Sequence, residues 1–122
     1  MTPANQLRKL IQAIPSVNAD HVHAFLIPKT EHTQTEPIIV VSEIDAIPSQ
    51  FGSNDFDTIR ERLQVQIYVP DQYTVSITDM TMRMAKILRI HGYYLFESTG
   101  ITRIPDTGQE LVTLKFNHEK EL

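Results

Sequence analysis

The sequence predicts an α+β fold in which an antiparallel β-sheet of about four to five strands carries two helices on one face. Two segments repeat apolar residues at helical spacing, and others alternate apolar with polar residues at a period of two. The strand segments follow one another as meanders and hairpins, which is typical of an antiparallel sheet. We therefore expect the element order α-β-β-β-α-β-β.

Two helices are expected from spacing and capping signals. The first is capped by Thr2, has Pro3 at its first position and stops at Pro15; its apolar face holds Leu7, Leu10, Ile11 and Ile14. The second covers residues 78–91, with Gly92 placed for a left-handed conformation directly after it. The apolar face of this second helix consists of Ile77, Met80, Met84, Ile87, Leu88 and His91.

Strands are expected at residues 21–27, 38–44, 63–69, 93–104 and 110–118. The cleanest alternation lies in residues 63–69 and 110–118, which predicts half-buried strands. The polar stretches 28–37 and 48–58 are expected as loops. Between the last two strands, Arg103 to Glu110 read RIPDTGQE, where Asp106 can bond backbone amides and Gly108 suits the left-handed conformation of a tight hairpin.

Length and composition indicate one domain over residues 1–122. The chain contains no cysteine, which excludes disulfides and thiolate chemistry. Its net charge of −4 argues against nucleic-acid binding driven by overall charge. The longest unbroken apolar runs, such as residues 38–41, hold only four residues and are far too short to span a bilayer. We expect a soluble protein that reads no nucleic-acid sequence and enters no membrane.

No residue set in the sequence indicates catalysis. His21 and His23 share one face of an expected strand, but a zinc site needs three or four convergent ligands and no pattern completes the set. There is no Gly-rich phosphate loop and no G-x-S-x-G motif. The expectation is a protein that is not an enzyme and holds no cofactor or metal. A stand-alone small-ligand or metal-binding domain that uses His21 and His23 is a less favoured alternative.

Several apolar residues lie where no core is expected. Met82 and Ile90 fall off the buried stripe of the second helix, and Phe51 and Phe56 sit in a polar loop. Such side chains either fold back on the core or contact a partner. A basic stripe on the same helix, Arg83, Lys86 and Arg89, is either a solvated face or a contact for an acidic partner or phosphates.

The second half of the chain resembles a family of small tail components from long-tailed phages and prophages of Gram-positive bacteria. The matching text is IYVPDQY after a strand, a helix, and then GYYLFESTGITRIPDTGQELVTLKF. Family members carry a hairpin loop close to DPDTGQ, which here reads IPDTGQ and departs at Ile104. The resemblance covers the chain from about Leu63 to the end. The first helix and strands match in order, not in motif.

The element order is also similar to that of siphophage tail terminators and tail-completion proteins. The resemblance implies a structural virion protein that forms a ring, commonly a hexamer, which caps the tail tube. Its implied partners are copies of itself, the major tail-tube protein and the head-completion or connector protein. DNA would pass through the ring without sequence-specific recognition. It would be made in the bacterial host cytoplasm and reside in the virion tail. A head–tail connector or neck component is the alternative.

A head-to-tail ring joins two different patches of the subunit. We expect the subunit or partner interface to include the loop aromatics and the outer side of the second helix, namely Phe51, Phe56, Met82, Arg83, Lys86 and Ile90.

Overall fold

The computed structural model describes residues 1–28, 36–49, 58–70, 76–105 and 108–121. Within these residues the α+β class, the two α-helices and the five strands are confirmed. The elements are α1 (Pro3–Gln12), the 3-10 helix η1 (Ala19–His21), β1 (Val22–Ala24), β2 (Ile38–Ser49), β3 (Thr58–Val69), α2 (Ile77–Ile90), β4 (Tyr93–Arg103) and β5 (Glu110–Glu121). The order differs from the predicted one only by η1.

The strands form one sheet in the order β1-β2-β3-β5-β4. Three neighbouring pairs are antiparallel, but β1 runs parallel to β2, with Val22 opposite Ile39 and Ala24 opposite Val41. The prediction of a purely antiparallel sheet is therefore wrong at this edge, and the sheet is mixed. Residues 25–37 separate the two strands, and about a dozen residues are enough to return a chain to the same end of the sheet.

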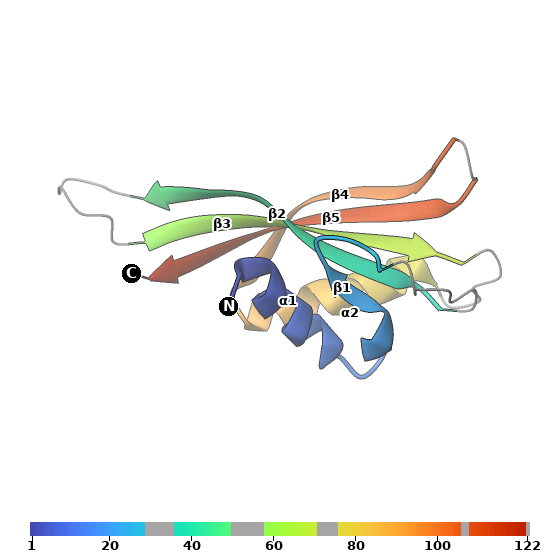
Figure 1. Cartoon of the computed structure of the whole chain (residues 1–122), viewed down its shortest axis with the longest axis horizontal. Coiled ribbons are helices and arrows are strands. Elements are labelled where there is room, and N and C mark those ends of the chain that lie inside the picture. Colours follow the sequence, from blue (N-terminus) through green and yellow to red (C-terminus); the bar gives the residue numbers. More distant parts are fainter. Residues whose placement is uncertain (29–35, 50–57, 71–75, 106–107, 122) are drawn as a thin grey trace.

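Both helices cover the same face of the sheet (Figure 1). The alternating residues of β3 and β5 point to this face, so that Leu63 lies opposite Phe116 and Val65 opposite Leu114. From the helices the core receives Ala4, Leu7, Ile11, Ile77, Met80, Met84 and Leu88. No helix of the described chain lies on the other face, whose Gln64, Gln66 and Thr113 are half-buried.

The start of α1 and the end of α2 follow the predicted signals, Thr2 and Gly92. Thr2 Oγ1 accepts a hydrogen bond from the Asn5 amide at 3.2 Å, and the α1 helix ends at Gln12, ahead of Pro15. Ser76 caps α2 in the same way, and Gly92 follows that helix with a φ of 86°. Neither helix in this part of the chain is long and apolar enough to cross a membrane.

The predicted strand 21–27 is wrong in its extent, because β1 holds only three residues. Phe25 leaves the extended region with a φ of 71°, and the Leu26 amide donates to the Ala24 carbonyl at 2.9 Å. This tight turn ends the strand. Conversely, β2, β3 and β5 run further than predicted, since their ladders continue through polar residues as far as Ser49, Thr58 and Glu121.

The longer strands project beyond the helices in two places (Figure 1). On one side β2, β3 and the end of β5 form a three-stranded arm. On the other side lies the turn of the β4–β5 hairpin, directly before Glu110, which lies opposite both Arg103 of β4 and Val69 of β3. The arm begins at a bulge, where Ile44 is the extra residue between Glu43 and Asp45. Directly after the bulge, Arg62 Nε lies 2.8 Å and 3.0 Å from the Asp45 carboxylate oxygens. Arg62 therefore ties β3 to the displaced stretch of β2.

The hairpin turn before β5 gives the first testable expectation. Gly108 has a φ of 71° and donates to the Ile104 carbonyl at 2.8 Å. An added Cβ would meet no atom within 4 Å, so a substitution costs backbone strain alone. We expect Gly108→Val to lower the free energy of unfolding by more than about 1 kcal/mol, since a β-branched residue resists positive φ. Gly108→Asn, which tolerates that conformation, is the matched control, and equal urea midpoints for the two variants would contradict the expectation.

The Asp45–Arg62 pair predicts a pH dependence. The hydrogen bonds from Arg62 hold the pKa of Asp45 below its ordinary value of 3.8. A carboxyl whose pKa is depressed in the fold stabilises the protein above its unfolded pKa, and this stabilisation disappears as the pH falls through the folded value. Between about pH 5 and about pH 2, the natural chain should therefore lose more stability than Asp45→Asn. Urea unfolding at each pH measures this, with Glu119→Gln as the exposed control. Parallel stability curves for the natural chain and Asp45→Asn would refute the expectation.

Candidate functional site

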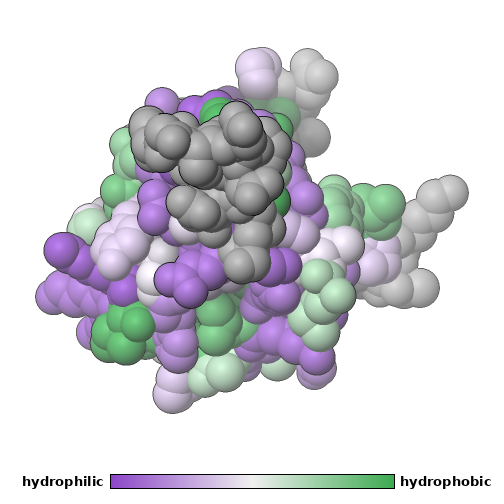
Figure 2. Space-filling model, turned by 90° about the vertical axis from the view of Figure 1, so that its left-hand side faces the viewer, coloured by the Kyte–Doolittle hydropathy of each residue, from purple (hydrophilic) through white to green (hydrophobic). Residues whose placement is uncertain are grey.

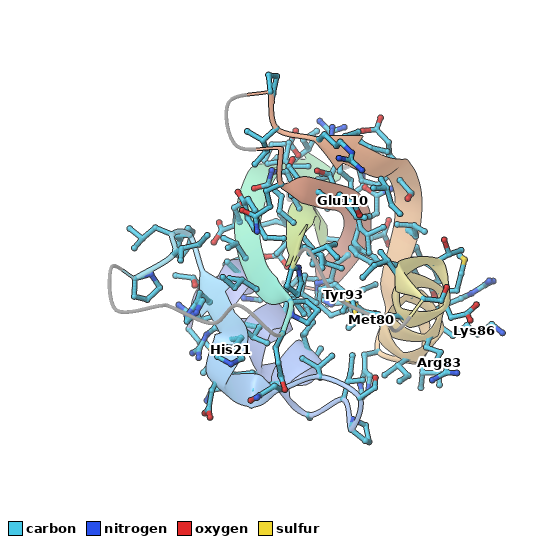
Figure 3. All side chains as sticks on the ribbon, turned by 90° about the vertical axis from the view of Figure 1, so that its right-hand side faces the viewer. His21, Met80, Arg83, Lys86, Tyr93 and Glu110 are labelled. Carbon is cyan, nitrogen blue, oxygen red and sulfur yellow. The ribbon has the colours of Figure 1, made fainter. Side chains whose placement is uncertain are left out.

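The outer face of α2 carries the helical residues of the predicted interface. Met82 and Ile90 are 46% and 82% exposed, whereas Met80 and Met84 are buried on the opposite side of the helix. Arg83 and Lys86 are exposed and point away from the sheet (Figure 3). The expectation that Met82 and Ile90 lie off the buried stripe is thus confirmed, and their contact with a partner stays a prediction. We call Met82, Arg83, Lys86 and Ile90 the α2 outer face.

Aromatic side chains on β4 border this surface. The Arg89 guanidinium lies 5.9 Å from the centroid of the Tyr94 ring, within the range of a cation–π contact. Tyr94 is 53% exposed and lies on β4, the outermost strand of the described sheet on this side. Sequence reasoning missed Tyr94, because an aromatic residue at the start of a strand is typical of a core position. Together with α2, this strand gives one lateral side of the molecule an exposed apolar and basic surface.

The remaining predicted positions are not brought into this surface. Phe51 and Phe56 lie outside the described residues. His21 ends η1 and His23 lies on β1, both half-buried and at the opposite edge of the sheet from α2. No group of three or more histidine, aspartate or glutamate side chains able to hold a metal occurs in the described residues.

A second exposed apolar group follows β1 directly. Phe25, Leu26 and Ile27 are 50%, 67% and 36% exposed. The left-handed Phe25 sits at the centre of a three-residue turn, a rare conformation that costs of order 1–3 kcal/mol for a bulky residue. Its amide is fixed by a 2.7 Å hydrogen bond to the Val41 carbonyl. We call these three residues the β1 corner. One sequence signal could have indicated this exposed turn: three bulky apolar residues in a row, which break the alternation of a strand, stand just before a proline.

A buried polar row crosses β3, β5 and β4 where the helix-covered body meets the arm. His118 Nδ1 lies 2.9 Å from Glu61 Oε1, and the imidazole stacks on the Tyr93 ring with centroids 4.1 Å apart. Glu61 is 5% and Tyr93 3% exposed. Burial raises the pKa of the Tyr93 phenol above its ordinary value, and the Glu61 carboxylate adds to the rise. The row therefore closes one end of the core with the Glu61–His118 pair and the Tyr93 ring stacked on the imidazole.

An open hollow of about 420 Å³ lies beside this row, between the start of α1 and the end of α2. Its lining consists of Met1, Gln6, Lys9, Leu10, His91, Tyr93 and His118. The contact with the Glu61 carboxylate holds the His118 ring in place at the edge of this hollow. Sequence reasoning missed the pair, although Glu61 and His118 share the alternation of Leu63 and Phe116 and thus interrupt a buried face with polar residues.

Removing the carboxylate of this row tests its structural contribution. Glu61→Ala should lower the free energy of unfolding by about 1–3 kcal/mol, because it leaves the half-buried His118 nitrogen without its partner. Glu61→Gln should cost less, since the amide keeps both shape and hydrogen bonding. Urea unfolding provides the measurement, and Arg60→Ala on the exposed side of the same strand should stay within about 0.5 kcal/mol of the natural chain. A Glu61→Ala variant as stable as Arg60→Ala would show that the Glu61–His118 contact contributes nothing to the free energy of unfolding.

Comparison with known proteins places this architecture in a family. A family model described as "Protein of unknown function (DUF806)" matches residues 1–121, which is nearly the whole chain. No curated protein matches the sequence. The family match runs through both helices, all five described strands and both exposed surfaces. The chain therefore belongs to the DUF806 family, whose description is "Protein of unknown function".

Proposed function

We propose that the chain is a structural subunit of a long non-contractile phage tail, which assembles as a ring that caps the tail tube and joins it to the head connector. The proposal starts from the resemblance of IYVPDQY and the IPDTGQ hairpin to small phage tail components. The described elements have the α+β arrangement that this resemblance implies, with a sheet backed by helices.

The observation that carries the proposal is the pair of unlike exposed surfaces at the two edges of the sheet. The β1 corner adjoins one outermost strand, and the α2 outer face adjoins the other. Exposed apolar residues that gather at one place, as Phe25, Leu26 and Ile27 do, can mark a site for a partner. Two different patches on opposite sides of a subunit support head-to-tail association, which closes into a ring when the rotation between neighbours allows it.

The three-stranded arm is the candidate contact for the tail tube or the head connector. It projects beyond the helices (Figure 1), and it exposes Ile44 and Ile47 by 41% and 42%. An arm of this kind can reach a neighbouring ring while the body contacts its own ring. With a net charge of −4, the subunit suits a channel through which DNA passes without being held.

Native mass spectrometry and light scattering test ring formation. The purified chain, from micromolar to millimolar concentration, should show a closed oligomer above the monomer mass, and added tail-tube protein should favour it. A strict monomer under all these conditions, alone and with tail tubes, would contradict the ring.

Deletion of the gene in its phage tests the role of the ring. Loss of a tail terminator should give tubes longer than normal in electron micrographs, because nothing stops polymerisation. Complementation with the natural chain should restore the normal length. Tails of normal length that fail to join heads would assign the chain to the head–tail connector instead, and normal infectious particles would overturn both roles.

A further inference from the structure

The hollow beside the polar row combines apolar surface with polar side chains that the fold leaves without a partner. It measures about 420 Å³, which lies within the size range of small-ligand pockets. Part of its apolar surface comes from Leu10 and Tyr93. Four lining side chains carry nitrogen, namely Gln6, Lys9, His91 and His118. Within the part of the chain that the structure describes, the Gln6, Lys9 and His91 side chains make no hydrogen bond or ion pair.

The elements that line the hollow lie on the side of the molecule from which the arm projects. Figure 1 shows the start of α1 and the start of β4 together on that side. Seen from the end of the arm, apolar and polar side chains adjoin one another on the body (Figure 2). A mixed surface of this kind suits a ligand that has an apolar body and a polar group.

The charges around the hollow favour an anion. No aspartate or glutamate is among its lining residues. Glu61 is engaged with His118 at 2.9 Å, and Glu43 accepts a hydrogen bond from a backbone amide at the start of α1. Glu119 directly follows His118 on β5, so strand alternation places it on the opposite face of the sheet. The Lys9 ammonium therefore has no carboxylate partner at the hollow.

The end of α2 opposes an anion only weakly. The carbonyl end of a helix carries partial negative charge. Here the last carbonyls are covered, because they accept from the His91 and Gly92 amides at 3.0 Å each. Lys120 lies two residues after His118 and thus on the same side of β5, where it adds a second cation. The hollow is therefore a locally basic site in a chain whose net charge is −4.

The two rings of the polar row are fixed before any ligand arrives. Tyr93 and His118 stack with an angle of 9° between their planes, and Glu61 holds the imidazole at Nδ1. Because an ionised carboxylate only accepts, Nδ1 carries the proton. His118 Nε2 has no hydrogen-bond partner among the described residues. Preformed rings lose little conformational entropy when a ligand binds against them.

We propose that the hollow is a binding site for a small organic anion with an aromatic body. Lys9 binds the negative group, and Gln6 and His91 donate hydrogen bonds to it. The aromatic body packs against Leu10 and Tyr93, where it meets apolar surface and a fixed ring. This site goes beyond the proposed tail role and does not depend on it.

Titration with 2-naphthoate tests the site, with 2-naphthalenemethanol as the uncharged ligand of similar shape. The chain contains no tryptophan, so naphthalene fluorescence is measured without a tryptophan background. The purified chain should bind naphthoate saturably, at least about threefold more tightly than the alcohol, since the ligand charge meets Lys9. Lys9→Gln should remove this preference, whereas Lys86→Gln on the α2 outer face should keep it. Both lysines are exposed, so both variants should keep the urea midpoint of the natural chain.

Nuclear magnetic resonance locates the bound ligand. Naphthoate should shift the imidazole signals of His91 and His118, which line the hollow. The signals of His21 and His23, which lie at the opposite edge of the sheet, should stay in place. These histidines therefore serve as internal controls in a single titration of the natural chain.

Several outcomes would overturn the site. The absence of saturable naphthoate binding would do so, and equal affinities for naphthoate and the alcohol would contradict an anion site. An equal loss of affinity in Lys9→Gln and Lys86→Gln would indicate general attraction to a cationic chain surface. Shifts confined to His21 and His23 would place the ligand elsewhere. None of these results bears on the tail role, which ring formation and tail length in the deletion phage decide separately.

Discussion

The antiparallel ladder between β3 and β5 holds both layers of the molecule in register. It pairs twelve residues of β3 with twelve of β5, from Thr58 opposite Glu121 to Val69 opposite Glu110. Because side chains alternate between faces, a shift of one residue would turn the whole apolar row away from the helices. The same ladder continues beyond the helix cover, where the buried Glu61–His118 pair replaces apolar contacts. Body and arm are therefore one continuous structure, joined at a polar layer.

Sequence periodicity was sufficient to predict the helices and strands that bury one face. Both helices and the strands β3 and β5 show the spacing that a half-buried element requires, and Thr2 and Gly92 mark helix ends as predicted. The direction of β1 could not be predicted in this way, because alternation is the same in parallel and antiparallel strands. The length of β2 could not be predicted from periodicity either, because its backbone pairing continues past the apolar run. Pro48 is tolerated there, since β2 is the outer strand of the arm.

The candidate surfaces were predictable to different degrees. Met82 and Ile90 could be identified because a helix has a fixed period, so an apolar residue off the buried stripe is visible in the sequence. The β1 corner was predicted as strand, since residues 21–27 form a short apolar segment with a β-branched residue near its start. Its exposure depends on the positive φ of Phe25, which no local residue preference favours in a bulky aromatic. Long-range contact with Val41 determines that conformation.

The exposed edges of the sheet would allow further copies to add by strand pairing, which the proposed ring must avoid. The outer strand β4 is interrupted by a bulge at Phe96 and by another at Thr99 and Gly100, and bulges twist an edge away from simple strand addition. Under the proposed function, subunits would instead associate through unlike side-chain surfaces, which close into a ring where the rotation between neighbours allows it.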